Sequence, residues 1–112
     1  MIIKTEDYSV ETSDENKAKL SGSMRLPSPI GYNEPFSNIK KGIEETNKTY
    51  CIDIQELNYL NSSGITSLAR LVILARKLNK SLTITANKSI PWQKRSIQSL
   101  THLWENLSLI YK

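Results

Sequence analysis

The tetrapeptide Asn61-Ser62-Ser63-Gly64 separates the two most strongly patterned stretches of the chain. Before it, residues 50–54 are largely apolar and rich in isoleucine, which predicts a buried strand. After it, residues 65–78 form the longest apolar-periodic segment, which predicts a helix that begins near Ser62. Asn and Ser side chains accept hydrogen bonds from the free N–H groups of a first helical turn, and glycine permits close approach to the backbone.

A hydroxyl at the start of that helix lies at the positive end of the helix dipole. A phosphate placed there would be stabilised by about 0.3–1 kcal/mol from the dipole when exposed. Two interpretations of Ser62 are therefore open at this point: helix capping alone, or capping together with a role as phosphoacceptor. Ser63 is expected to support either role.

The length of 112 residues predicts one domain that spans residues 1–112. The single cysteine, Cys51, excludes an internal disulfide and fits a reducing compartment. The first residues lack the apolar core of a secretory signal, and no apolar run approaches the roughly 18 residues of a membrane span. We therefore expect a cytoplasmic protein that does not enter a membrane.

The charge balance is mildly basic, with 15 Lys and Arg against 11 Asp and Glu and a formal charge of +4. The basic residues occur in pairs rather than in long runs, and no aromatic stacking platform accompanies them. Nucleic acid is therefore not an expected partner. The composition does not fix an oligomeric state.

Alternation and helical periodicity predict the order of the elements. Strands are predicted at residues 8–12, 17–26, 49–54, 82–86 and 107–111, with a turn at 13–16, a proline-containing loop at 26–32 and a connection at 55–60. Helices are predicted at residues 33–47 with Asn33 as the cap, at residues 62–78, and in a third segment that Asn87 or Ser89 caps and Asn106 ends.

Strand–helix–strand units imply parallel neighbours, and the opening hairpin makes the sheet mixed. We therefore predict a single α/β domain: a mixed β-sheet with an N-terminal hairpin and helices packed largely on one side.

Apolar residues cover most of the circumference of the predicted helix 62–78. Thr66, Arg70 and Lys77 share one narrow polar strip, into which Ile73 also falls. A helix covered so widely either lies deep in the fold or presents an apolar strip to a partner. Both interpretations are open for Ile73 and Leu74.

Residues 51–64 resemble the signature region of the STAS domain, the domain of bacterial anti-sigma factor antagonists, also called anti-anti-sigma factors. The family pattern is a hydrophobic strand, a short acidic-polar link with a central Leu, an aromatic residue, a hydrophobic residue and then Asp-Ser-Ser/Thr-Gly opening a helix. The matching residues are Leu57, Tyr59, Leu60 and the tetrapeptide. The predicted order of elements is similar as well, so the resemblance covers most of the chain.

The resemblance implies a regulatory protein-binding module. Such proteins bind a GHKL-type serine kinase that is also an anti-sigma factor, and the kinase phosphorylates the Ser that follows the family's Asp. The modified protein releases its partner, and a phosphatase restores binding. The matching residue is Ser62, where a phosphate would add about −1.5 to −2 charge to the contact face. The implied partner-binding residues are Asn61, Ser62, Ser63, Gly64, Thr66, Arg70 and Ile73.

The chain departs from the family pattern at two places. The family's Asp is Asn61 here, which caps a helix about as well but carries no charge. The sequence given also ends with the predicted final strand, so we expect the domain without the closing helix that the family usually adds there.

Two other classes of function were considered. Some lone STAS proteins resemble this chain and dock on the ATPase of an ABC lipid-transport system, where the serine need not be modified. An enzyme is not expected, because no acid–base or nucleophile constellation is present. The single His102 and single Cys51 give no metal-ligand spacing, and no cofactor-binding motif is found.

Overall fold

The computed structural model describes residues 1–14 and 16–112. The chain forms six strands, three α-helices and two 3₁₀ helices in the described residues. They are β1 (Ile2–Lys4), β2 (Tyr8–Asp14), β3 (Lys17–Met24), η1 (Pro29–Tyr32), α1 (Ser37–Glu45), β4 (Tyr50–Leu60), α2 (Ser62–Lys77), β5 (Leu82–Ala86), α3 (Pro91–Ile97), η2 (Gln98–His102) and β6 (Leu107–Tyr111).

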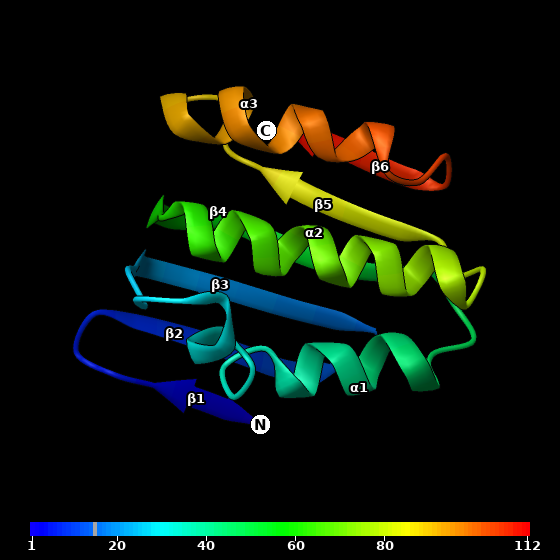
Figure 1. Ribbon diagram of the computed structural model, residues 1–112, viewed down its shortest axis with the longest axis horizontal. Coiled ribbons are helices and arrows are strands. Elements are labelled where there is room, and N and C mark those ends of the chain that lie inside the picture. Colours follow the sequence, from blue (N-terminus) through cyan, green and yellow to red (C-terminus); the bar gives the residue numbers. More distant parts are fainter. Residues whose placement is uncertain (15) are drawn as a thin grey trace.

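All six strands form one mixed sheet in the order β1-β2-β3-β4-β5-β6. The pairs β1–β2 and β2–β3 are antiparallel, and the pairs from β3 to β6 are parallel. Each parallel crossover steps in the same direction, and right-handed crossovers of that kind bring every helix to one face. Figure 1 shows α1, α2 and α3 side by side in front of the sheet. The predicted fold class is confirmed.

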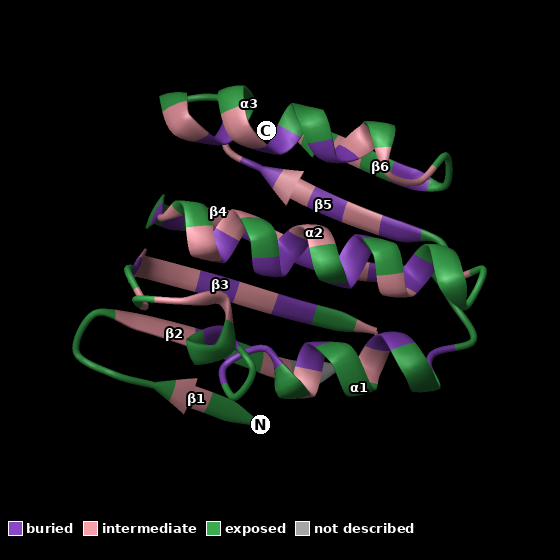
Figure 2. Ribbon diagram, in the orientation of Figure 1, coloured by how far each residue is buried: buried purple, intermediate pink, exposed green. Residues whose placement is uncertain are grey.

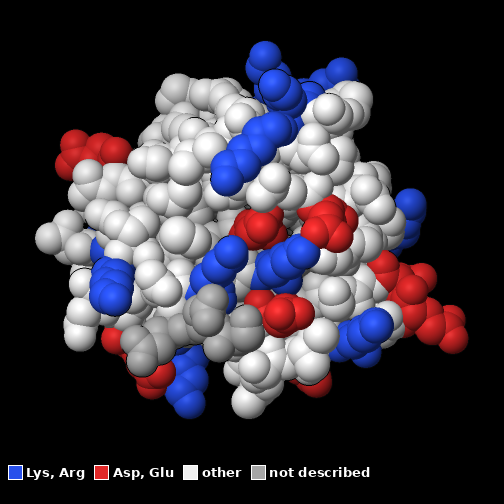
Figure 3. Space-filling model, turned by 180° about the vertical axis from the view of Figure 1, so that it is seen from behind, with Lys and Arg blue, Asp and Glu red and all other residues white. Residues whose placement is uncertain are grey.

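Side-chain alternation along the strands separates the core from an open face (Figure 2). Buried residues that face the helices include Ala18, Leu20, Ile52, Ile54, Leu82 and Ile84. The residues between them, among them Asp53 and Thr83, lie on the opposite face and are half-exposed. On that side Figure 3 shows acidic and basic side chains interspersed. The hydrogen bond between Lys19 and Glu56, which form an ion pair there, raises the pKa of Lys19.

Strand β4 is longer than the sequence predicted, because residues 55–60 continue the strand instead of forming a connection. It pairs with all of β3 by means of two register shifts, but with β5 only over residues 50–53. Side chains from the segment after β5 bind the carbonyl groups beyond that point. Gln93 Nε2 donates to the carbonyls of Ile54 and Leu57 at 2.7 and 2.9 Å, and Trp92 Nε1 donates to that of Asn58 at 2.7 Å.

Several other boundaries differ from the prediction. The third helical segment, which the sequence predicts to run to Asn106, ends as α3 at Ile97 and is followed by η2 up to His102. Asn33 ends η1 instead of capping α1, whose N-cap is Phe36. Ile90 occupies the N-cap of α3, while the Asn87 side chain accepts a hydrogen bond from the N–H of Ser89 in the preceding turn. Strand β2 runs on through residue 14, so it takes up part of the predicted turn, and Glu15 lies outside the described residues. Strand β1 was not predicted.

Helix α1 packs tightly on the start of β4. A Cβ atom built on Gly42 would lie 2.5 Å from Cε1 of Tyr50, which is closer than real side chains approach. Tyr50 is fully buried, and this burial raises the pKa of its hydroxyl to about 12. The helix therefore needs a glycine at this position in order to sit on the ring.

We predict that Gly42→Ala lowers the free energy of unfolding by about 1–3 kcal/mol, because the added methyl group overpacks the Tyr50 contact. In an unobstructed helix the same change stabilises by about 0.5–1 kcal/mol, so the sign is diagnostic. Urea unfolding followed by circular dichroism measures the change. Gly31→Ala is the control, since its Cβ would meet nothing nearer than 3.4 Å. A more stable Gly42→Ala variant would contradict the packing argument.

Candidate functional site

Ser62 lies exposed where β4 passes into α2. Asn61 is the N-cap, with extended backbone, and Ser62 is the first helical residue. The side-chain and main-chain oxygens of Asn61 accept hydrogen bonds from the N–H groups of Gly64 and Ile65, both at 3.0 Å. Within residues 1–14 and 16–112, no acceptor binds the N–H groups of Ser62 and Ser63. The first turn therefore keeps two donors that an anion at Ser62 can use.

The Asn61 side chain holds three parts of the chain together. Its Oδ1 accepts from the Gly64 N–H and also from the Tyr32 hydroxyl at 2.7 Å, and its Nδ2 donates to the Leu26 carbonyl at 2.8 Å. The loop after β3, the helix η1 and the start of α2 thus meet on one amide. A carboxylate has no donor for the Leu26 carbonyl. This contact is the physical reason why Asn, and not Asp, fits at this position.

Gly64 lies in the first turn of α2 and is buried. A Cβ there would lie 2.2 Å from Leu60 Cδ1 and 2.9 Å from the Tyr32 hydroxyl. The groups that approach Gly64 closely are therefore the side chains of Leu60 and Tyr32, which belong to the same domain. Gly64 lies behind the exposed surface and does not form part of it.

The exposed side of α2 continues the surface that begins at Ser62. Thr66 and Arg70 are exposed, and Ile73 keeps 39% of its surface accessible although it is apolar. Ser63 is half-buried, and its carbonyl accepts a hydrogen bond from the hydroxyl of the buried Ser67 at 2.9 Å. The structure thus brings the predicted residues Ser62, Thr66, Arg70 and Ile73 onto one helix at the surface.

A shallow depression of about 480 Å³ lies beside Ser62, between the first turns of α2 and the segment that follows β5. Tyr59, Thr66, Ser96 and Ser99 are among its lining residues. The guanidinium carbon of Arg25 lies 4.2 Å from the centre of the Tyr59 ring, which is a cation–π contact. Tyr59 therefore contacts Arg25 and lines the depression together with Ser62, whereas Arg25 is not one of the lining residues.

Tyr32 and Gln93 are the two important positions that the sequence prediction missed. The sequence predicts a loop at Tyr32 and indicates no role for Gln93. Gln93 is fully buried, and its Oε1 accepts from the Asn87 N–H at 2.8 Å while its Nε2 binds β4. No local pattern marks a polar residue as buried. The Asn at position 61, in place of the family's Asp, was the one signal that an unusual acceptor lies nearby.

Asp53 and His102 lie away from this site. Asp53 Oδ1 accepts hydrogen bonds from the main-chain N–H and the side-chain amide of Gln55, both within β4. His102 is exposed at the end of η2. In the described part of the chain, His, Cys, Asp and Glu side chains form no group of three or more that could hold a metal ion.

Comparison with known proteins yields a likeness of fold. A scan against models of protein families gives no match, and a search of curated proteins finds no significant match. Among solved structures, the chain is similar to SiaC in the crystal structure of the diguanylate cyclase SiaD in complex with its activator SiaC from Pseudomonas aeruginosa. The TM-score is 0.71 at 13% sequence identity, and the match covers 100% of this chain and 99% of that chain. The two proteins therefore share the whole fold.

None of the helices formed by the described residues has the length and apolar character needed to cross a membrane.

We predict that Asn61→Asp lowers the free energy of unfolding by about 1–3 kcal/mol, because the Leu26 carbonyl loses its donor and faces a carboxylate oxygen instead. Urea unfolding measures the change. Asn58→Asp is the matched control, because Asn58 is exposed and no hydrogen bond of its side chain is found in the described residues. Equal stability of the Asn61→Asp and wild-type proteins would show that the amide donor of Asn61 does not contribute to stability.

Proposed function

We propose that this chain is a regulatory protein-binding module that presents Ser62 and the exposed side of α2 to a protein partner, and that phosphorylation of Ser62 switches the contact. The observation that carries the proposal is the exposed hydroxyl on the first residue of a 16-residue helix whose first turn is fixed by Asn61. The likeness to the STAS signature around Ser62 points to the same residue.

The electrostatics around Ser62 favour a phosphate there. Helix α2 has no Asp or Glu from end to end, so no acidic side chain of its own opposes the added charge. Two free N–H groups and the positive end of the helix dipole lie at the modified residue. A phosphoserine would therefore be tolerated without unfolding the turn.

The same phosphate would weaken a protein contact that covers the residue. A partner that binds over Ser62 excludes water, and it would have to desolvate a group of about −1.5 to −2 charge. Ser62, Thr66, Arg70 and Ile73 are the residues that we assign to the exposed contact, with Asn61, Ser63 and Gly64 shaping it. The proposed partners are a GHKL-type serine kinase with anti-sigma activity and a phosphatase that reverses the modification, in the cytoplasm. In this role the chain binds and does not catalyse.

A second candidate function is supported by the fold likeness to SiaC, which is the activator of the diguanylate cyclase SiaD in the structure named above. In that case the regulated partner of this chain would be a diguanylate cyclase instead of an anti-sigma factor. The site and the switch at Ser62 would be the same, and only the protein that is released would differ.

We predict that Ser62 becomes phosphorylated when the purified chain is incubated with ATP and an extract of its own cells, and that mass spectrometry maps the phosphate to this residue. Ser62→Ala should lose the modification. Ser37→Ala is the matched control, because Ser37 is also the exposed first residue of a helix. A phosphate that maps elsewhere, with Ser62→Ala fully modified, would remove Ser62 from its proposed role.

The effect on binding is measured with the same extract. Each variant is immobilised on an affinity support. Ser62→Asp should bind the partner at least about tenfold more weakly than wild type, which corresponds to about 1.4 kcal/mol of binding free energy. Ser37→Asp should bind it as tightly as wild type. The partner's identity then separates the two candidates. A kinase-like protein supports the first, and a captured protein with diguanylate cyclase activity that rises on adding the chain supports the second.

A further inference from the structure

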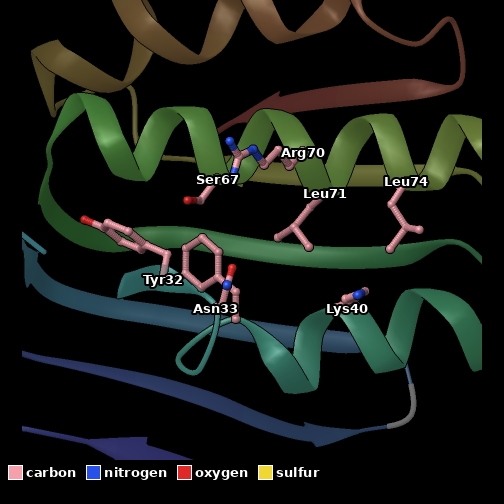
Figure 4. Close-up of a pocket in the computed structure, with 8 residues that line it drawn as sticks. Tyr32, Asn33, Lys40, Ser67, Arg70, Leu71 and Leu74 are labelled. Carbon is pink, nitrogen blue, oxygen red and sulfur yellow. The ribbon is translucent and has the colours of Figure 1, made fainter. Parts of the chain in front are cut away.

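A groove of about 270 Å³ lies between α1 and α2 (Figure 4). We call it the α1–α2 groove. Its apolar lining comes from Tyr32, Phe36, Leu71 and Leu74, and its two cations are Lys40 on α1 and Arg70 on α2. In Figure 4, Leu71 and Leu74 point from α2 toward α1, and Lys40 lies across from them.

Neither cation of the groove forms an ion pair among the side chains that the structure describes. Lys40 and Arg70 are both exposed. Among the side chains that the structure describes, the only ion pair joins Lys19 and Glu56 on the open face of the sheet. Helix α2 contributes only basic charged residues, so the wall that carries Arg70 holds no carboxylate. The groove thus combines an apolar floor with unpaired positive charge on both walls.

We propose that the α1–α2 groove binds an acidic amphipathic segment of the protein partner, with a bulky apolar side chain between the helices and carboxylates toward Lys40 and Arg70. A cavity of about 150 Å³ already holds a benzene ring, so the groove has room for one large side chain and part of a second. The carboxylates supply the charge complementarity that fixes orientation and speeds association. The inference rests on the proposed function, because it assigns a second contact to the same partner.

The groove and the Ser62 contact are neighbouring parts of one surface. Arg70 belongs to both, and Tyr32 lines the groove while it donates its hydroxyl hydrogen to Asn61. Arg70 lies eight positions after Ser62 in α2, which is about 12 Å along the helix axis. That distance exceeds the screening length of about 8 Å at physiological ionic strength. A charge at Ser62 should therefore change affinity in the groove little, and the two contacts can be tested separately.

The probe is a synthetic 16-residue amphipathic helix with Leu at alternating spacings of three and four and Glu on both flanks. Its twin carries Lys in place of Glu. ¹⁵N-labelled full-length protein is titrated with each peptide, and amide shifts give the site and the affinity. We expect shifts at Lys40, Arg70 and Leu74 with the acidic peptide and none with its twin. Ser62→Asp should bind the acidic peptide within twofold of wild type.

The variant Lys40→Glu/Arg70→Glu should weaken the acidic peptide at least tenfold, and Lys40→Gln/Arg70→Gln should weaken it less. The matched control is Lys41→Glu/Lys94→Glu, which makes the same change of net charge at exposed residues that do not line the groove. It should bind within twofold of wild type. Circular dichroism verifies that each variant is folded.

Several results would overturn the inference. Equal losses in the two Glu pairs would mean that net charge alone attracts the peptide. Shifts on the open face of the sheet, or equal binding of the Lys twin, would place the contact elsewhere. Concentration-dependent self-association that Lys40→Glu/Arg70→Glu abolishes would make a second copy of this chain the occupant. The peptide-binding results do not depend on whether Ser62 is phosphorylated. The phosphorylation experiment therefore tests the proposed function separately from the groove.

Discussion

The site depends on one side-chain amide. Asn61 donates to the Leu26 carbonyl and accepts from both the Tyr32 hydroxyl and the Gly64 N–H. Through these bonds, a loop some 30 residues earlier in the chain fixes the direction in which α2 leaves the sheet. The exposed position of Ser62 follows from this arrangement, because the residue before it cannot rotate without breaking three hydrogen bonds.

A second constraint acts on the part of β4 that leads to Ser62. Strand β4 extends past β5, and a strand edge with unpaired carbonyls is costly when buried. Gln93 and Trp92 supply the missing donors from outside the sheet. Gln93 is fully buried, and both polar atoms of its side chain are hydrogen-bonded. Its amide therefore takes the place of a neighbouring strand along this part of β4. The turn at Ser62 can therefore lie beyond the part of β4 that pairs with β5.

Helix α2 links two properties of the protein. Its inner side is packed on the sheet through residues such as Leu68 and Val72, which gives a rigid support. Its outer side presents a hydroxyl at one end and a basic, partly apolar surface along the next turns. The protein thus carries its exposed hydroxyl and its exposed apolar surface on one well-packed helix. The chain shares its whole fold with SiaC.

The sequence by itself determined the α/β class, most of the strands, the extent of α2 and the position of Ser62 at its start. These follow from alternation, helical period and capping chemistry, which act between residues close in the chain. Only the tertiary structure decided that β4 runs on to Leu60 and that Gln93 and Tyr32 serve the site. These features depend on hydrogen bonds between residues about 30 or more positions apart, and no local pattern encodes which distant donor meets which acceptor.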